Sequence, residues 1–174
     1  MTASSPGEVP GFLPGLAVAA ALAAIAGPWL GRLLRIGGIH AAVIILSLGA
    51  IIAATLTPLR GWPDFALPPI PCDLRRVGLA PFSELLGLND TSLNILLFAP
   101  LGAALALVPR AGWRLLAGAA ALPFLIETIQ LVVPPLARGC ESADVVDNLT
   151  GLVLGASLGW LVRTVAAATV QQGR

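Results

Sequence analysis

Five long apolar stretches constrain this sequence more than any other feature. A membrane-spanning helix rises about 1.5 Å per residue and needs about 20 mostly apolar residues. Runs of about that length cover residues 14–30, 39–57, 92–108, 113–133 and 143–166, separated by arginine, proline and glycine. The chain of 174 residues is 57% hydrophobic and only 11% charged, whereas soluble domains have about 25% charged residues. The sequence therefore predicts an all-α, polytopic membrane protein with about five transmembrane helices.

Charge excludes one class of partner and argues against one kind of processing. The formal net charge is only +1, so we expect no nucleic-acid partner recruited by bulk positive charge. Residues 1–13 carry Glu8 and no basic residue, whereas a cleaved signal peptide begins with a basic region. We therefore expect residues 1–13 to be a short outer tail and the first apolar run to be retained as an anchor.

The distribution of arginine predicts the orientation, because basic residues in short loops stay on the cytoplasmic side. With the N-terminus outside, the short inner segments hold Arg32, Arg35, Arg110, Arg114, Arg163 and Arg174. The much longer outer segments then hold only Arg60, Arg75, Arg76 and Arg138. The sequence therefore predicts an N-out, C-in bundle, with two N-terminal helices over residues 14–57 and a cytoplasmic tail at residues 167–174.

The segment 58–91 is a proline-rich outer loop in this topology. Its six prolines exclude a continuous helix, and its apolar residues predict that it folds back onto the outer membrane face. Cys72 lies in this loop and Cys140 in the next outer segment. Thiols outside the cell tend to oxidise, and a disulfide between these two cysteines would pin the loop over the last helical hairpin. The alternative is two free thiols.

Polar residues inside the spans are the main functional signal, because ionisable groups there are costly and usually face the bundle interior or a wet cavity. Alternation of the spans brings one polar cluster to the outer leaflet, with Arg138 as its nearest cation. The cluster consists of Asn94, Glu127, Gln130, Arg138, Glu141, Asp144 and Asn148. In one interpretation these side chains only satisfy one another as interhelical contacts; in the other they form a binding site.

Carboxylates outnumber cations in this cluster. Glu127, Glu141, Asp144 and Asp147 face one local arginine, Arg138. This excess requires a bound cation, protonation of some carboxylates, access of water, or outer-loop arginines folding over the cluster. The arginines available for the last option are Arg75 and Arg76.

Three glycines share the face of the last span that carries the cluster. Gly151, Gly155 and Gly159 are spaced by four residues, a small-residue pattern that lets another helix backbone approach closely. We expect them to pack helices.

The region 75–166, with three predicted spans, resembles the VanZ-like family, whose founding member is a teicoplanin-resistance protein of glycopeptide-resistant bacteria. The matching motifs are Pro81-Phe82; Asn94, Phe98, Pro100 and Gly102; Glu127 and Gln130; and Arg138, Glu141, Asp144, Asn148 and Gly151. The chain departs from the family at Glu141, where Asp is commoner, and in its first span, an addition to the family's four-helix plan. The resemblance implies a multi-pass protein of the bacterial cytoplasmic membrane, with lowered teicoplanin susceptibility in some members.

Three functional classes remain open. The first is a non-enzymatic envelope protein whose cluster binds a polar headgroup, a peptide terminus of a cell-wall precursor, or a cation, with Arg75 and Arg76 assisting. The second is a membrane enzyme in which Glu127, Glu141 and Asp144 hold a divalent ion that acts on a lipid-linked phosphate. The third is an assembly protein that uses its glycine face. We predict no cofactor beyond such a cation, and no arrangement of serine, cysteine or histidine supports nucleophilic catalysis.

Overall fold

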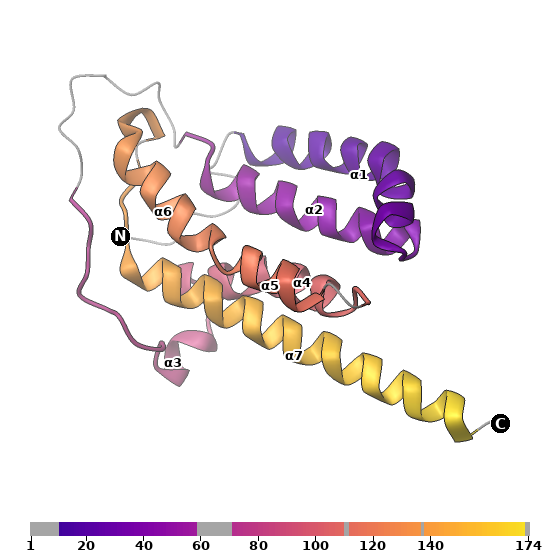
Figure 1. The fold of residues 1–174 in the computed structure, drawn as a ribbon. Helices are drawn as coiled ribbons and strands as arrows, with labels where there is room; N and C mark the ends of the chain where they lie inside the picture. Colours follow the sequence, from indigo (N-terminus) through magenta and orange to yellow (C-terminus); the bar gives the residue numbers. More distant parts are fainter. Residues whose placement is uncertain (1–10, 59–70, 110–111, 137, 173–174) are drawn as a thin grey trace.

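The computed structural model describes residues 11–58, 71–109, 112–136 and 138–172, and it is built of helices (Figure 1). The elements are α1 (Phe12–Leu34), α2 (Gly38–Thr55), α3 (Phe82–Leu85), α4 (Asp90–Ala106), α5 (Gly112–Ala119), α6 (Leu122–Val132), the 3₁₀ turn η2 (Pro134–Leu136) and α7 (Ser142–Gln172). The predicted all-α class is thus confirmed. Three arginines used above for orientation, Arg60, Arg110 and Arg174, lie outside the described residues.

Four helical segments are long and apolar enough to cross a membrane. They are Phe12–Leu34, Gly38–Thr55, Gly112–Val132 and Ser142–Thr169. Helix α4 is also apolar but has only 17 residues, a length of about 25 Å at the usual rise. The chain is therefore a multi-pass membrane protein by the length and composition of its helices.

The fourth apolar run is not one continuous helix. The sequence predicts a single helix over residues 113–133, but the backbone turns at Ala120 and Ala121 between α5 and α6. Pro123 lies in the first turn of α6. Because proline has no backbone N–H and its ring clashes with the carbonyl four residues earlier, the helical ladder is interrupted at this point.

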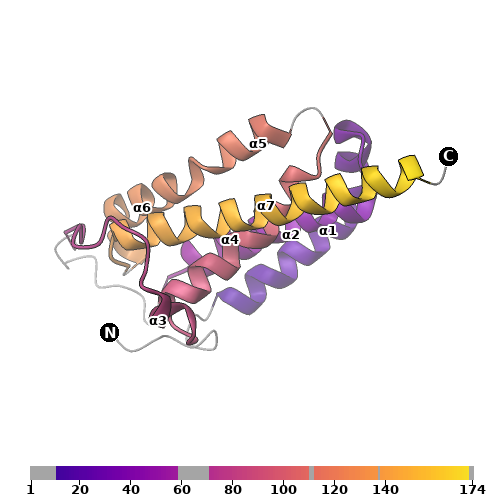
Figure 2. The ribbon, with the colours of Figure 1, turned by 90° about the horizontal axis from the view of Figure 1, so that it is seen from below.

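Helix α7 is longer than predicted. It runs for 31 residues, and its C-terminal part extends beyond the other helices (Figures 1 and 2). Residues 164–172 contain no glycine or proline and are rich in alanine, the residue with the highest helix propensity. The helix therefore continues past the last residue of the apolar run.

Small residues allow two very close helix pairs, α1 with α2 and α4 with α7. On α7, a Cβ atom added at Gly151, Gly155 or Gly159 would collide with the α4 backbone. The predicted close approach is therefore made within the chain, and this face of α7 is not free to recruit a second membrane protein. Phe98 and Leu101 of α4 are fully buried in the core that this pair shares with α2.

Polar side chains gather at one end of the bundle, which we call the polar end. It contains the start of α1, the end of α2, the start of α4, the end of α6 and the start of α7. Contacts between Gly11 and Thr57, Gln130 and Thr55, Asn94 and Asp144, and Glu127 and Glu141 connect these helix ends. The helices therefore run alternately toward and away from this end.

Candidate polar site

The start of α4 is fixed by a capping box that places Asn94 in its second turn. The Asn89 side chain accepts a hydrogen bond from the Ser92 amide at 2.9 Å, and the Ser92 hydroxyl accepts one from the Asn89 amide. Such reciprocal bonds satisfy the free N–H groups at a helix start. From there, the Asn94 amide nitrogen donates to Asp144 Oδ1 at 2.8 Å. A neutral donor on α4 thus holds a carboxylate of α7.

The buried carboxylate of α7, that of Asp147, is held by the outer loop. Arg76 donates to both oxygens of Asp147, at 3.0 Å from Nη1 and 2.5 Å from Nη2. The Asp147 side chain is only 2% exposed, and that of Arg76 is 28% exposed. The hydrogen bond to Asp147 raises the pKa of Arg76 above its ordinary value. A two-pronged guanidinium–carboxylate pair is among the stronger polar contacts in proteins.

The neighbouring Arg75 takes no part in the site. It pairs with Asp73, and its side chain is 90% exposed. The hydrogen bond from Arg75 holds the pKa of Asp73 at about 2. Of the two arginines that could fold over the cluster, only Arg76 does so.

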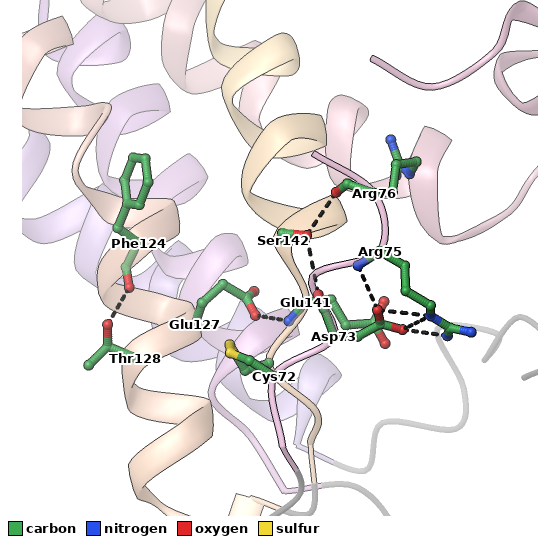
Figure 3. The surroundings of a disulfide bond; sticks show 10 residues. Cys72, Asp73, Arg75, Arg76, Phe124, Glu127, Thr128, Glu141 and Ser142 are labelled. Atoms are coloured by element: carbon green, nitrogen blue, oxygen red, sulfur yellow. Dashed lines mark hydrogen bonds and ion pairs between the residues drawn. A yellow bond between two sulfur atoms is a disulfide. The ribbon is translucent and has the colours of Figure 1, made fainter. Parts of the chain in front are cut away.

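A strap, residues 71–79, covers the start of α7 (Figure 3). Cys72 and Cys140 form a disulfide. Next to it, the Asp73 amide donates to the Cys140 carbonyl at 2.8 Å, and the Ser142 amide donates to the Asp73 carbonyl at 2.9 Å. The Ser142 hydroxyl also donates to the Arg76 carbonyl at 2.8 Å. These bonds fix the strap in the register that brings Arg76 to α7.

The contact between Glu127 and Glu141 joins the carboxylate of Glu127 to the backbone amide of Glu141. Glu127 is 5% exposed, and its Oε2 accepts a hydrogen bond from the Glu141 amide at 2.7 Å (Figure 3). Glu141 itself is exposed. The buried carboxylate of Glu127 is therefore satisfied by a neutral N–H group.

Gln130 and Arg138 bind backbone carbonyls at the end of α2. The Gln130 amide nitrogen donates to the Thr55 carbonyl at 3.0 Å, and Arg138 Nε donates to the Thr57 carbonyl at 3.1 Å. The last carbonyls of a helix have no partner within it, so Gln130 caps α2, while Arg138 binds the backbone just beyond the helix end. Burial lowers the pKa of Arg138, while the charges of Asp144 and Glu127 act in the opposite direction.

Three buried side-chain atoms at this end have no hydrogen-bond partner among the described residues. They are Gln130 Oε1, Arg138 Nη2 and Asn148 Oδ1, and we call them the open polar atoms. Gln130 and Asn148 are 6% and 1% exposed. Leaving a buried polar group unsatisfied costs about 1–3 kcal/mol, so each of these atoms has hydrogen-bonding capacity that the described residues do not use.

The carboxylates do not converge as metal ligands. Within the described ranges, no group of three or more His, Cys, Asp or Glu side chains is arranged to hold a metal ion. The only histidine, His40, lies at the other end of the bundle, where its Nε2 is 2.6 Å from the Ala104 carbonyl and links α2 to α4. The site is therefore built from amides, carboxylates and two guanidinium groups.

Sequence reasoning missed some of these partners. The four motif residues of α4 have separate structural places: Asn94 in the site, Phe98 in the core, Pro100 on the surface and Gly102 against the α7 backbone. The charge balance of the sequence makes Asp147 an excess charge and does not assign it to the site. Its signal was its position three residues after Asp144, within one turn of the same helix. The carbonyl partners of Gln130 and Arg138 carried no signal, because every residue has a carbonyl.

Comparison with known proteins agrees with the resemblance noted in the sequence. The model of the VanZ/LLP1 family matches residues 44–163, well over half of the chain. The match begins within α2 and leaves α1 outside it. No curated protein and no solved structure matches the chain at a significant level. The chain belongs to the VanZ/LLP1 family.

Proposed function

We propose that this member of the VanZ/LLP1 family is a binding protein of the bacterial cytoplasmic membrane that holds a polar group at the outer surface. The observation that carries the proposal is the set of open polar atoms. Arg138 Nη2 is a charged donor, and Gln130 Oε1 and Asn148 Oδ1 are acceptors. A group that satisfies all three has an anionic oxygen and at least one N–H or O–H donor, as lipid headgroups and peptide termini do.

The charges around the open polar atoms support a group that carries both signs. Among the described residues, Arg138 has no carboxylate within salt-bridge distance, whereas Arg76 forms a salt bridge with Asp147. The carboxylates of Glu127, which is buried, and Asp144, which is half-buried, are held only by neutral donors. An anion on Arg138 and a cation beside Glu127 or Asp144 would complete these interactions, since charge-assisted hydrogen bonds are the stronger ones.

In the proposed orientation the polar end lies at the outer surface, in a bundle of five spans with the N-terminus outside. The arginine distribution supports this orientation. The disulfide between Cys72 and Cys140 lies at the polar end, and disulfides persist on the oxidising side of a membrane. Helix α4, at about 25 Å, is short for a span. It packs along the face of the long α7 that carries Gly151, Gly155 and Gly159.

Lowered susceptibility to teicoplanin-type glycopeptides would be one consequence of such binding. A protein that holds a cell-wall precursor or a lipid at the outer surface changes what the antibiotic meets there. The test is to express Arg138→Gln and Asn148→Ala variants and to measure teicoplanin susceptibility together with the yield of folded protein in detergent.

Arg75→Gln is the matched control, because Arg75 is exposed and paired only within the strap. The proposal expects folded protein and a lost phenotype for Arg138→Gln and Asn148→Ala, and no change for Arg75→Gln. Loss of folding in both site variants would instead mean that the cluster only holds helices together.

A further inference from the structure

The segment between the strap and α4 exposes every large apolar side chain that it has. Residues 80–88 contain three leucines and one phenylalanine, and the exposed fractions of these side chains lie between 40% and 82%. The short helix α3 within this segment has no buried residue. Glu84 is the only charged residue of the segment. We call residues 80–88 the foot.

Polar groups fix the foot to the start of α4. The Asn89 side chain donates to the Glu84 carbonyl at 2.6 Å, and the Ser92 hydroxyl donates to the Gly87 carbonyl at 2.6 Å. The Glu84 carboxylate accepts from the Thr91 hydroxyl of α4 at 3.5 Å. The polar side of α3 therefore faces the protein.

The apolar side of α3 faces away from the protein. Phe82, Leu85 and Leu86 are spaced by three residues and by one, so they share one helical face, and all three are exposed. Figures 1 and 2 show α3 at the side of the bundle rather than across the ends of its helices. This face is therefore open to whatever surrounds the bundle at the level of α3.

The foot lies at the level where the bundle enters the membrane. Asn94 in the second turn of α4 donates to Asp144 in the first turn of α7, so the two helices begin at about the same level. The segment Ser142–Thr169 of α7 is long and apolar enough to cross a membrane. A segment bonded to the start of α4 therefore lies beside the first turns of a membrane-crossing helix, where lipid surrounds the bundle.

We infer that the foot is a lipid-binding surface that lies in the headgroup layer of the leaflet at the polar end, with Phe82, Leu85 and Leu86 directed toward the acyl chains. The backbone of the foot does not enter the hydrocarbon core, because most of it is not helical and its N–H and C=O groups need water or headgroups as partners. The charge of Glu84 would also be costly in the core. An amphipathic segment in the headgroup layer buries its apolar face by about 5–10 Å. This contact is independent of what the polar site binds.

The test attaches a maleimide nitroxide label to single positions of the full chain in phosphatidylcholine vesicles, without reductant. The two cysteines of the chain are joined in the disulfide, so an added cysteine is the one free thiol. Phe82→Cys and Leu86→Cys report on the foot. Arg75→Cys, at the exposed arginine of the strap, is the control for water, and Leu22→Cys, at an exposed leucine in the middle of α1, is the control for lipid.

Collision rates of the label with a water-soluble nickel complex and with oxygen, which concentrates among acyl chains, give its depth. We expect the labels at positions 82 and 86 to collide with the nickel complex roughly three times less often than the label at position 75, because their side chains are buried in lipid. They should still meet nickel more often than the label at position 22 does. Their collisions with oxygen should be more frequent than those at position 75.

Two results would overturn the inference and leave the proposed function in place. One is a nickel collision rate at either foot position equal to that at position 75, which would put the foot in water. The other is a low collision rate with both reagents, which would mean that protein, such as a second copy of the chain, covers the foot. Helical circular dichroism and an intact disulfide confirm that each labelled variant is folded.

Discussion

Removal of Arg76 is expected to destabilise the protein far more than removal of its neighbour Arg75. The Arg76→Ala change leaves the carboxylate of Asp147, which is 2% exposed, without its cation. Removing one partner of a buried ion pair costs about 3–5 kcal/mol. Because the Arg76 side chain is itself 28% exposed, we expect a value near the lower limit, about 3 kcal/mol. Arg75→Ala removes a surface pair, which contributes about 0–1 kcal/mol.

The free energy of unfolding can be measured for both variants by titrating mixed micelles with a denaturing detergent and following helical circular dichroism. A double variant, Arg76→Ala with Asp147→Asn, should recover much of the loss, because no unpaired charge then remains buried. The reasoning is refuted if Arg76→Ala is as harmless as Arg75→Ala, or if Asp147→Asn adds a second full loss. Either result would mean that Asp147 is stabilised without the strap.

Further predictions test helix packing, the disulfide and the orientation. Gly155→Ala should cost about 1–3 kcal/mol, because its Cβ would collide with the Ala99 backbone; Gly118→Ala, which meets nothing within 4 Å, should stabilise α5 by roughly 0.5–1 kcal/mol. Equal effects in the same unfolding assay would contradict this packing. Non-reducing peptide mass spectrometry of freshly purified protein should recover the Cys72 and Cys140 peptides linked, and two free thiols would argue against the bond. A reporter protein fused after residue 174 should be active if it is of a type that functions in the cytoplasm and inactive if it functions only in the periplasm. Activity of a periplasmic reporter at this position would contradict the predicted orientation.

The fold class followed from the sequence because it depends on bulk properties. An apolar run of sufficient length has few stable alternatives to a helix in a membrane, so the four long apolar segments could be located without tertiary information. The position of Pro123 inside the fourth run was a signal of the α5–α6 break, since proline interrupts a helical ladder. The apolar run does not predict that α7 extends beyond residue 166, because this extension depends on the helix propensity of alanine and not on hydrophobicity.

The site was harder to predict because its contacts join distant residues. Alternation of spans placed Asn94 and Asp144 at one end, and their side chains are hydrogen-bonded in the structure. The pairing of Arg76 with Asp147 depends on the path of the strap, which the disulfide and the bonds to Ser142 fix. Arg75 and Arg76 are equivalent in the sequence, and only the register of the strap decides which of them turns inward.

The way the charges are paired argues against a purely structural cluster. In a cluster that served only to hold helices, we would expect Arg138 to pair directly with Glu127 or Asp144, because an opposite charge stabilises a buried carboxylate more than a neutral donor does. Instead Glu127 is held by a backbone amide and Asp144 by Asn94, while Arg138 donates to the Thr57 carbonyl. Apart from the Arg76–Asp147 pair, Arg138 thus lies in one site with Glu127 and Asp144 without a salt bridge to either, and this is the arrangement of charges that the proposed ligand would complete.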